Sequence, residues 1–252
     1  MTATFHDLQN SSVFITGGGN GIGAALTDGF LAQGAQVAFV GRSDASSFVT
    51  QMGEKHGATP LFIPCDITKT TALQAAMDQA AAAHGPITVL VNNAANDMRF
   101  DALDVTEDAW DNSQAINLRA YFFACQHAAK GMMSGGAIIN LSSITYMFGA
   151  DGMVPYVTAN AGITGMTRAL AREWGAQNIR VNAIAPGWVL TEKQETMWAT
   201  PESKSAFLAR QCLPRFMTPE DMAGTVLFLA SDGAAMMTGQ TLALDAGVVH
   251  TG

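Results

Sequence analysis

Short apolar runs recur along the chain and alternate with longer segments in which apolar residues return every three or four positions. The short runs indicate buried strands, and the spaced segments indicate amphipathic helices. Seven strands are predicted, at residues 13–16, 36–40, 61–65, 87–91, 137–141, 179–184 and 240–244. Alternation of strands and helices along the whole chain predicts one α/β domain over residues 1–252, a doubly wound seven-stranded parallel sheet with helices on both faces.

The longest helical patterns cover residues 69–83, 106–133 and 154–175. The second pattern contains Asn117, a poor helix former, which holds a water, marks a bend or simply faces solvent. A capped helix is predicted at residues 218–230, which begin with Thr-Pro and carry Asp three positions after the Thr. Residues 188–217 are expected to form a long irregular loop of the kind that closes over a substrate.

The first predicted strand runs into a glycine-rich loop and then into a helical pattern. This loop contains Gly17, Asn20, Gly21, Ile22 and Gly23. Glycines let the backbone approach a pyrophosphate closely, and the helix that follows offers free N–H groups and the positive end of its dipole. Strand, glycine loop and helix in this order predict a dinucleotide-binding site in preference to a flexible turn.

The residues after the second and third strands bear on the adenosine end of such a cofactor. Arg42 and Ser43 follow the second strand, and the first carboxylate beyond it is Asp44. An acidic residue directly after the strand suits the ribose 2′-hydroxyl of NAD, whereas an arginine suits the 2′-phosphate of NADP. We therefore favour NADP, with NAD as the alternative if Arg42 is an ordinary surface charge. Asp66, followed by Ile67, is expected to contact the adenine, to cap a helix beginning near residue 68, or both.

Composition and charge exclude several other classes of protein. With 48% hydrophobic and 13% charged residues, the chain is globular. A formal net charge of −8 without a basic run argues against a nucleic-acid partner. The sequence starts without a signal peptide and contains no apolar stretch of about 18 residues, so we expect a cytoplasmic protein without membrane contact. Cys65, Cys125 and Cys212 lack metal-ligand spacing, so we expect reduced core cysteines and no metal site.

Ser143 and Tyr156 are the strongest candidates for chemistry. A tyrosine hydroxyl can give or take a proton, and a serine beside it can hold a substrate oxygen. Tyr156 falls in the first turn of the helix at residues 154–175, and Asn160 lies one turn further on the same face.

With these motifs in this order, the chain resembles the short-chain dehydrogenase/reductase family over essentially its full length. The resemblance rests on the glycine loop, the Asn-Asn-Ala-Ala segment at residues 92–95, Asn117, the spacing of thirteen residues between Ser143 and Tyr156, and a later Pro-Gly pair. It implies a Rossmann fold and hydride transfer to or from a nicotinamide, with Ser143, Tyr156, Asn117 and position 160 in the catalytic machinery. It also implies further cofactor contacts from Asn93, Ala94, Pro186, Gly187, Val189 and Thr191.

Within the family, residues 91–97, 165–173 and 191–195 are similar to bacterial aldose (xylose-type) dehydrogenases. This similarity implies a small-molecule substrate, a sugar or other polyol-like secondary alcohol; the alternative substrate is a ketone or 3-oxoacyl thioester. The expected substrate contacts are Asn96, Asp97, Arg99 and Gln194 for hydroxyl groups, with Trp188 or Trp198 stacked on the sugar face. The family commonly forms tetramers, and the apolar faces of residues 106–133 and 154–175 fit a homotetramer.

Asn160 departs from the family pattern, which is Tyr-x-x-x-Lys. In the family that lysine holds the ribose hydroxyls and lowers the pKa of the tyrosine. An amide can still bond a hydroxyl, but it brings no charge, and losing the charge reduces the phenolate fraction by roughly 10- to 1,000-fold. Three interpretations are open: a natural variant with slower or alkaline-shifted chemistry, an inactivating substitution introduced to trap a complex, or the mark of a catalytically weak binding protein that retains the cofactor site.

Overall fold

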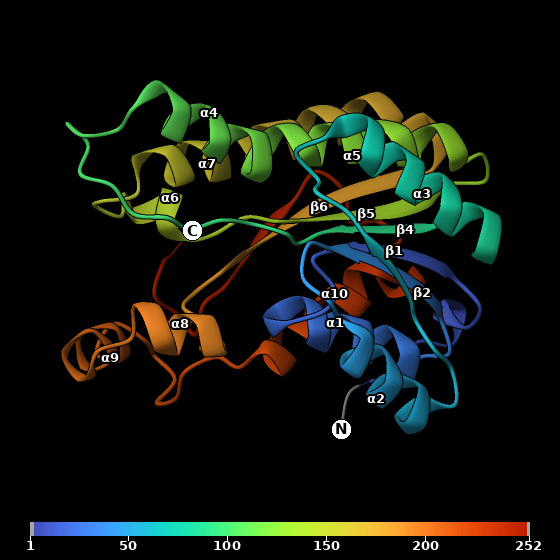
Figure 1. The fold of residues 1–252 in the computed structure, drawn as a ribbon, viewed down its shortest axis with the longest axis horizontal. Coiled ribbons are helices and arrows are strands. Elements are labelled where there is room, and N and C mark those ends of the chain that lie inside the picture. The colour runs from blue at the N-terminus through green and yellow to red at the C-terminus, as the bar shows by residue number, and fades with distance from the viewer. Residues whose placement is uncertain (1–2, 251–252) are drawn as a thin grey trace.

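Seven strands form one parallel sheet in the order β3-β2-β1-β4-β5-β6-β7, as the computed structural model shows for residues 3–250 (Figure 1). The strands are β1 (Ser12–Thr16), β2 (Gln36–Gly41), β3 (Leu61–Pro64), β4 (Val89–Asn92), β5 (Gly136–Leu141), β6 (Ile179–Pro186) and β7 (Thr241–Leu244). The predicted seven-stranded, doubly wound sheet is therefore confirmed, with strand ends that differ by one or two residues from those expected.

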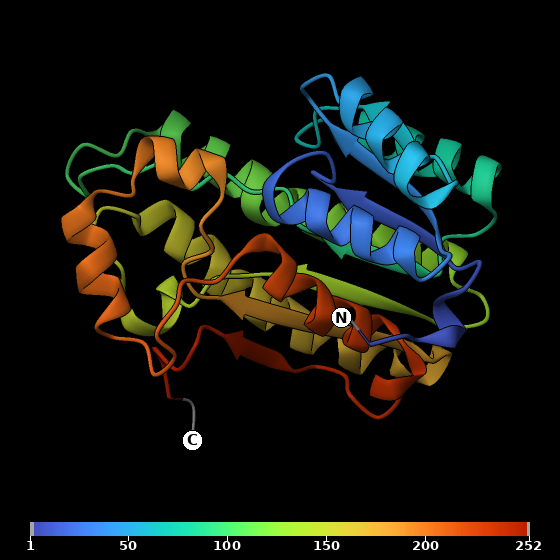
Figure 2. The same cartoon turned by 90° about the horizontal axis from the view of Figure 1, so that it is seen from below.

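Helices cover both faces of the sheet (Figures 1 and 2). One layer contains α1 (Gly21–Ala32), α2 (Ser46–His56) and α10 (Pro219–Ala230), and the other contains α3 (Thr70–His84), α4 (Glu107–Gln114), α5 (Ala120–Gly131) and α7 (Val154–Trp174). Strand β1 shows why its sequence is apolar throughout. Val13 and Ile15 pack into the core beneath α1 and α10, whereas Phe14 packs into the core on the opposite face.

Residues 188–217, here named the lid segment, are not one irregular loop, so that prediction was wrong. They contain α8 (Glu192–Met197) and α9 (Pro201–Leu208). Each helix begins at a threonine cap: the Thr191 hydroxyl accepts the N–H of Gln194, and Thr200 and Ser203 bond each other's backbone N–H groups. These caps stabilise the starts of two short helices, whose sequences have no helical period of apolar residues to predict them.

Two other expectations need correction, and one helix was missed. Residues 106–133 do not form one helix, because a π-helical turn at Ala115–Arg119 separates α4 from α5. Helix α2 was not expected, and its weak pattern explains why, since Met52 is its one buried residue. Cys65 and Cys125 are buried as predicted, but Cys212 is exposed.

The direction in which the strand order runs reverses between the neighbouring strands β1 and β4. The sheet continues from β1 to β2 and β3 on one side, and from β4 to β5, β6 and β7 on the other. At such a switch point, the loops that follow neighbouring strands diverge and leave a crevice at the carboxyl ends. The glycine loop after β1 and the segment after β4 border that crevice. Within residues 3–250, no helix combines the length and the apolar character needed to cross a membrane.

Candidate active site

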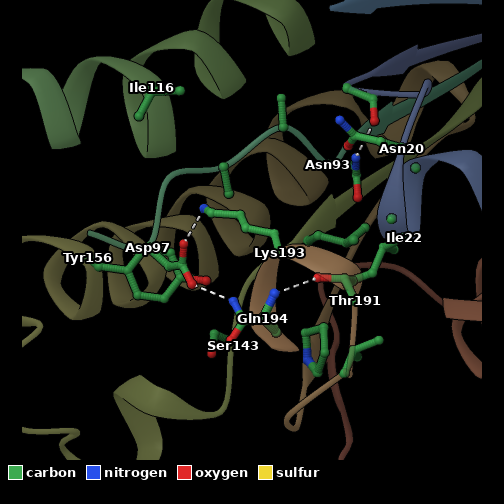
Figure 3. A pocket seen from close by; sticks show the side chains of 18 of the residues that line it. Asn20, Ile22, Asn93, Asp97, Ile116, Ser143, Tyr156, Thr191, Lys193 and Gln194 are labelled. Atoms are coloured by element: carbon green, nitrogen blue, oxygen red, sulfur yellow. Dashed lines mark hydrogen bonds and ion pairs between the residues drawn. The ribbon is translucent and has the colours of Figure 1, made fainter. Parts of the chain in front are cut away.

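A cavity of about 910 Å³ extends along the carboxyl ends of the strands, from the glycine loop to α7 and the lid segment (Figure 3). It brings together most of the residues singled out in the sequence. Those that line it are Gly17, Asn20, Gly21, Ile22, Gly23, Arg42, Ser43, Asp66, Ile67, Asn93, Ala94, Asp97, Arg99, Ser143, Tyr156, Pro186, Gly187, Trp188, Val189, Thr191 and Gln194.

The glycine loop is shaped for a close ligand. Gly17 and Gly21 have φ angles of +70° and +49°, a region that favours glycine. A Cβ at Gly23 would lie 1.8 Å from the carbonyl oxygen of Gly17, so a side chain there would disrupt the loop. In the described chain, Asn20 makes no side-chain cap to α1, which leaves the first N–H groups of that helix unshielded. This cradle fits a pyrophosphate.

Asn93, which directly follows the neighbouring strand β4, holds the glycine loop by hydrogen bonds. Its Nδ2 donates to the carbonyl oxygens of Thr16 and Gly17, both at 3.0 Å, and its backbone N–H donates to the Thr16 hydroxyl. The amide of Asn93 is thereby occupied by the loop, so Asn93 shapes the glycine loop as well as lining the cavity.

The carboxylates at the adenosine end of the cavity are held by local turns. The Asp44 carboxylate accepts from the backbone N–H and the hydroxyl of Ser46 at the start of α2. Asp66 likewise accepts from the N–H and hydroxyl of Thr68, which lowers its pKa against the opposing effect of burial; the charge of Arg42 lowers it further. Asp66 closes this turn instead of capping α3, which begins two residues later than Thr68. Arg42 itself is exposed at the cavity edge.

Ser143 and Tyr156 face the same end of the cavity (Figure 3). Ser143 follows β5, and its Oγ accepts hydrogen bonds from the backbone N–H and the hydroxyl of Thr145, at 3.2 and 3.0 Å. Tyr156 lies in the first turn of α7 and is partly exposed to the cavity. Burial raises the pKa of Tyr156 to about 12, and the charge of Asp97 adds to the rise, whereas the side chains of Ser143 and Asn160 oppose it.

Asn117 and Asn160 lie behind the cavity wall. Asn117 sits in the π-helical turn and is 1% exposed, so the solvent-facing interpretation is wrong, and the regular α-helix is interrupted at this residue. Its side-chain amide forms two hydrogen bonds with the backbone of Asn96: it accepts from the N–H at 2.8 Å and donates to the carbonyl at 2.9 Å. Asn160 is 2% exposed, and its Nδ2 donates to the carbonyl oxygen of Tyr156 at 2.8 Å. The amide turns back on its own helix.

An ion pair between two distant segments lies at the end of the cavity beside Ser143 and Tyr156, here called the substrate end because the substrate is expected there (Figure 3). Asp97 follows β4, and its Oδ1 lies 2.5 Å from the Nζ of Lys193 on α8. Its Oδ2 accepts from Nε2 of Gln194 at 2.6 Å, and Oε1 of Gln194 accepts from the indole N–H of Trp188 at 2.9 Å. Burial raises the pKa of Asp97, but the bonds and charge from Lys193 and the bond from Gln194 outweigh it, so the pKa is lowered and the carboxylate is charged.

Lys193 was missed in the sequence, although it lies inside the segment at residues 191–195 that carried the aldose dehydrogenase similarity. Tyr121 was also missed. It is 1% exposed and borders the cavity, and its hydroxyl has no hydrogen-bond partner within residues 3–250. The sequence feature that could have predicted Tyr121 is its position one helical turn after Asn117, on the same side of the helical segment.

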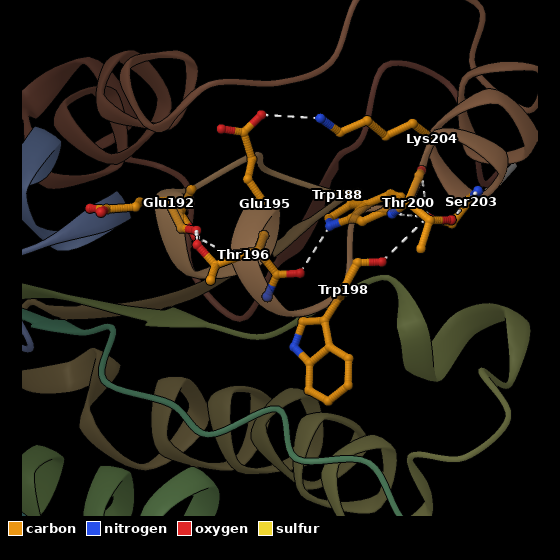
Figure 4. Close-up of polar contacts among 10 residues, drawn as sticks. Trp188, Glu192, Glu195, Thr196, Trp198, Thr200, Ser203 and Lys204 are labelled. Atoms are coloured by element: carbon orange, nitrogen blue, oxygen red, sulfur yellow. Dashed lines mark hydrogen bonds and ion pairs between the residues drawn. The ribbon is translucent and has the colours of Figure 1, made fainter.

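The remaining substrate candidates, Trp188, Trp198 and Arg99, also make contacts within the protein. Trp188 packs edge-on against Phe207 and Phe216, with ring centroids 5.5 and 5.9 Å away, so it is part of the lid core as well as the cavity wall. The Arg99 guanidinium lies 4.4 Å from the ring centroid of Trp198 and helps to hold the lid segment down. Figure 4 shows the polar contacts that order this segment.

Comparison with known proteins agrees with this geometry. The family model described as enoyl-(acyl carrier protein) reductase matches residues 17–249. The chain is 45% identical to the "Probable galactose dehydrogenase" of Rhizobium meliloti and to the D-xylose 1-dehydrogenase of Caulobacter vibrioides, covering 98% of itself and of each relative. The chain belongs to the short-chain dehydrogenase/reductase family.

One solved structure is similar to this chain over nearly its full length. It is a blue fluorescent protein from a metagenomic library in complex with NADPH, which superposes with a TM-score of 0.89 at 34% identity, over 97% of this chain and all of the other. Family membership confirms the expectation of an oxidoreductase that acts on CH–OH groups with a nicotinamide cofactor.

Proposed function

We propose that this short-chain dehydrogenase/reductase transfers a hydride between NADP and a sugar or polyol-like secondary alcohol. The observation that carries the proposal is the shape of the cavity, which is continuous from the glycine loop to Ser143 and Tyr156 and ends in a cluster of polar side chains. Hydroxyl-rich substrates need several donors and acceptors close to the reacting carbon. Asp97 and Gln194 provide them here, and the names of the galactose and xylose dehydrogenase relatives support the same substrate class.

Ser143 orients the substrate oxygen. Its Oγ already accepts two hydrogen bonds from Thr145, so its own hydrogen is free to donate into the cavity. A donor aimed at the reacting oxygen stabilises the charge that develops on that atom as the bond order changes.

Tyr156 gives or takes the hydroxyl proton. When bound, the nicotinamide supplies the hydride acceptor or donor, held by the glycine loop and residues 186–191. With a pKa of about 12, only about 0.001% of Tyr156 is phenolate at pH 7, so the phenol is a poor base near neutrality. The same pKa suits the acid that protonates a reduced carbonyl, which favours carbonyl reduction as the second candidate reaction.

The preference for NADP is supported at the adenosine end. Arg42 is exposed at the cavity edge, where a guanidinium can pair with a 2′-phosphate. Asp44, the carboxylate nearest in sequence, is engaged by Ser46 and is therefore less available to a ribose 2′-hydroxyl. Asn96, Asn117 and Asn160 are proposed to support the site from behind the wall, and a homotetramer in the cytoplasm stays the expected form.

The test is initial-rate oxidation of a panel of aldoses with NADP and NAD, from neutral to alkaline pH, on this chain and on Asn160→Lys. We expect an aldose to be oxidised by this chain with a rate that climbs toward alkaline pH. Asn160→Lys should be faster near neutrality by roughly 10- to 1,000-fold, because a lysine one turn below Tyr156 restores the charge.

Tyr156→Phe serves as the control, since it removes the proton carrier and should abolish turnover in both backgrounds. If neither chain oxidises any aldose but ketones are reduced, the second candidate reaction replaces the first. An unchanged pH–rate profile in Asn160→Lys would contradict the role given to position 160.

A further inference from the structure

The substrate end of the cavity has lost the cation that the family pattern places on α7. Asn160 brings no charge, and its amide is committed to the carbonyl of Tyr156. The titratable groups that act on Tyr156 come from other elements: Asp97 from the segment after β4 and Tyr121 from α5. Of these, only the Asp97 carboxylate is charged at neutral pH, and a negative charge disfavours the phenolate.

A lysine from the lid segment meets this carboxylate. Nζ of Lys193 lies 2.5 Å from Oδ1 of Asp97, and the Asp97 side chain is only 17% exposed. Two other cations line the cavity, but Arg42 stands at the adenosine end and Arg99 lies over Trp198. Lys193 is therefore the cation of the substrate end that is bonded to a group acting on Tyr156.

The neighbours of Lys193 fix this arrangement. Gln194 takes the second oxygen of Asp97, and the indole N–H of Trp188 orients the Gln194 amide so that its NH₂ group faces the carboxylate. The base of the lid segment is held as well, because Leu190 donates its N–H to the carbonyl of Met217 at 2.9 Å. Helix α8 thus presents Lys193 to Asp97 from a segment tied down at its base.

We propose that Lys193 is a positioning residue, which reaches from α8 to pair with Asp97 beside Tyr156 and so offsets part of the negative charge that disfavours the phenolate. The inference rests on the proposed function, in which Tyr156 carries the proton. One consequence is that the Asp97 charge beside Tyr156 is offset only while α8 holds Lys193 against Asp97.

The experiment follows the ionisation of Tyr156 directly. The chain has three tyrosines, so a protein labelled with ¹³C at the tyrosine ring carbon that bears the hydroxyl gives three NMR signals, and Tyr156→Phe identifies one of them. The titration is done in the Asn160→Lys background, in which the phenol ionises at an accessible pH. The variants are Lys193→Met, Lys193→Arg, and Lys193→Met combined with Asp97→Asn.

Lys193→Met should raise the pKa of Tyr156 by about half a unit to one unit, a three- to tenfold loss of phenolate at a given pH. Lys193→Arg keeps the charge and should leave the pKa near that of the parent. Adding Asp97→Asn to Lys193→Met removes the unbalanced carboxylate and should cancel the rise. A Tyr156 pKa that does not move in Lys193→Met overturns the inference, since a lysine that merely fastens the lid would change turnover without changing this ionisation.

Lys204→Met is the matched control on the same lid segment. Lys204 pairs with Glu195 at 3.1 Å and lies outside the cavity lining (Figure 4), so its loss should leave both the titration and turnover unchanged. The titration needs no turnover. Failure of every variant to oxidise an aldose would therefore defeat the proposed function alone, whereas an unmoved Tyr156 pKa with normal aldose oxidation would defeat this inference alone.

Discussion

Side-chain length decides what position 160 can contact. A lysine carries its ammonium group on a four-carbon stem, whereas the amide of asparagine is one carbon from the backbone carbon. Asn160 is buried one turn after Tyr156, so its amide finds the nearest acceptor, which is the carbonyl of Tyr156 itself. Buried amides are usually hydrogen-bonded, and the NH₂ group of this one donates within its own helix. The site consequently depends on more distant residues for positive charge.

A single exposed side chain should also set the choice of cofactor. Arg42→Gln should weaken binding of NADP by about tenfold, or about 1.4 kcal/mol, because the 2′-phosphate loses a charge-assisted partner; binding of NAD should change little. The measurement is a fluorescence titration of each nucleotide on the parent and the variant. Arg168→Gln removes a similar charge from an exposed position on α7 and is the control. Equal NADP affinity in parent and Arg42→Gln would show that Arg42 is an ordinary surface charge.

At the scale of elements, helix ends do much of the positioning. Helix α8 begins at its Thr191 cap, and the methyl group of Thr191 would lie 3.2 Å from a Cβ at Gly21, so the start of the lid segment packs on the glycine loop. Helix α7 begins with a proline in its first turn and places Tyr156 there. A helix end fixes a side chain in direction as well as in position, because the backbone angles of the first turn are set.

Helix α10 offers a test of how much one cap contributes. Arg215 donates to both oxygens of Asp221, at 2.6 and 2.7 Å, and Thr218 donates its N–H to Asp221 at 2.8 Å. The bond from Arg215 lowers the pKa of Asp221 to about 2, against the opposing effect of burial. A carboxyl group with a lowered folded-state pKa stabilises the fold above its unfolded pKa of about 3.9, and that stabilisation disappears as pH falls toward 2.

Asp221→Asn should therefore lower the free energy of unfolding by about 1 kcal/mol at pH 7, by about half as much near pH 3 and by much less near pH 2, because the parent loses the charge as it is acidified. Urea unfolding at a series of pH values measures both. Glu220→Gln, an exposed carboxylate in the same turn, should have only a small effect at any pH. A difference between parent and Asp221→Asn that stays constant with pH would contradict the role given to the charge.

At the scale of the whole molecule, the strand order places every functional loop at one edge of the sheet. Neighbouring strands β1, β4 and β5 end in the glycine loop, the segment that carries Asp97, and Ser143. The opposite surface of the layer formed by α4, α5 and α7 stays partly apolar, with Trp110, Phe122 and Val154 between 37% and 43% exposed. Apolar side chains gathered on helices of one layer are typical of a surface that packs against another subunit.

Phe122→Glu should break up the expected homotetramer, because a charge would have to be buried without a partner between subunits. Light scattering coupled to size exclusion should give about four times the 26.4 kDa chain mass for the parent and a smaller mass for the variant. Met133→Glu places the same charge at an 88% exposed position after α5 and should leave the assembly intact. A parent that elutes as a monomer would show that the tetramer prediction was wrong.

The amino-acid sequence alone was sufficient for the features that depend on neighbouring residues. Short apolar runs located all seven strands, and the order of strand, glycines and helix located the glycine loop that lines the cavity. The Thr-Pro-x-Asp start of α10 was also correct to the residue, with Thr218 as its cap. Each of these rests on backbone geometry within a few positions, so it can be recognised before the chain is folded.

Only the tertiary structure decided how charge is arranged around Tyr156. Asp97 and Lys193 are 96 positions apart in sequence, and nothing local to either side chain reveals its partner. Their pairing requires the sheet to bring the segment after β4 to the same edge as β6, and α8 to lie across it. The inward turn of Asn160 was equally hidden, since it depends on how closely α7 is packed by its neighbours. Electrostatic interactions act through space, so their pattern emerges only once distant segments are placed together.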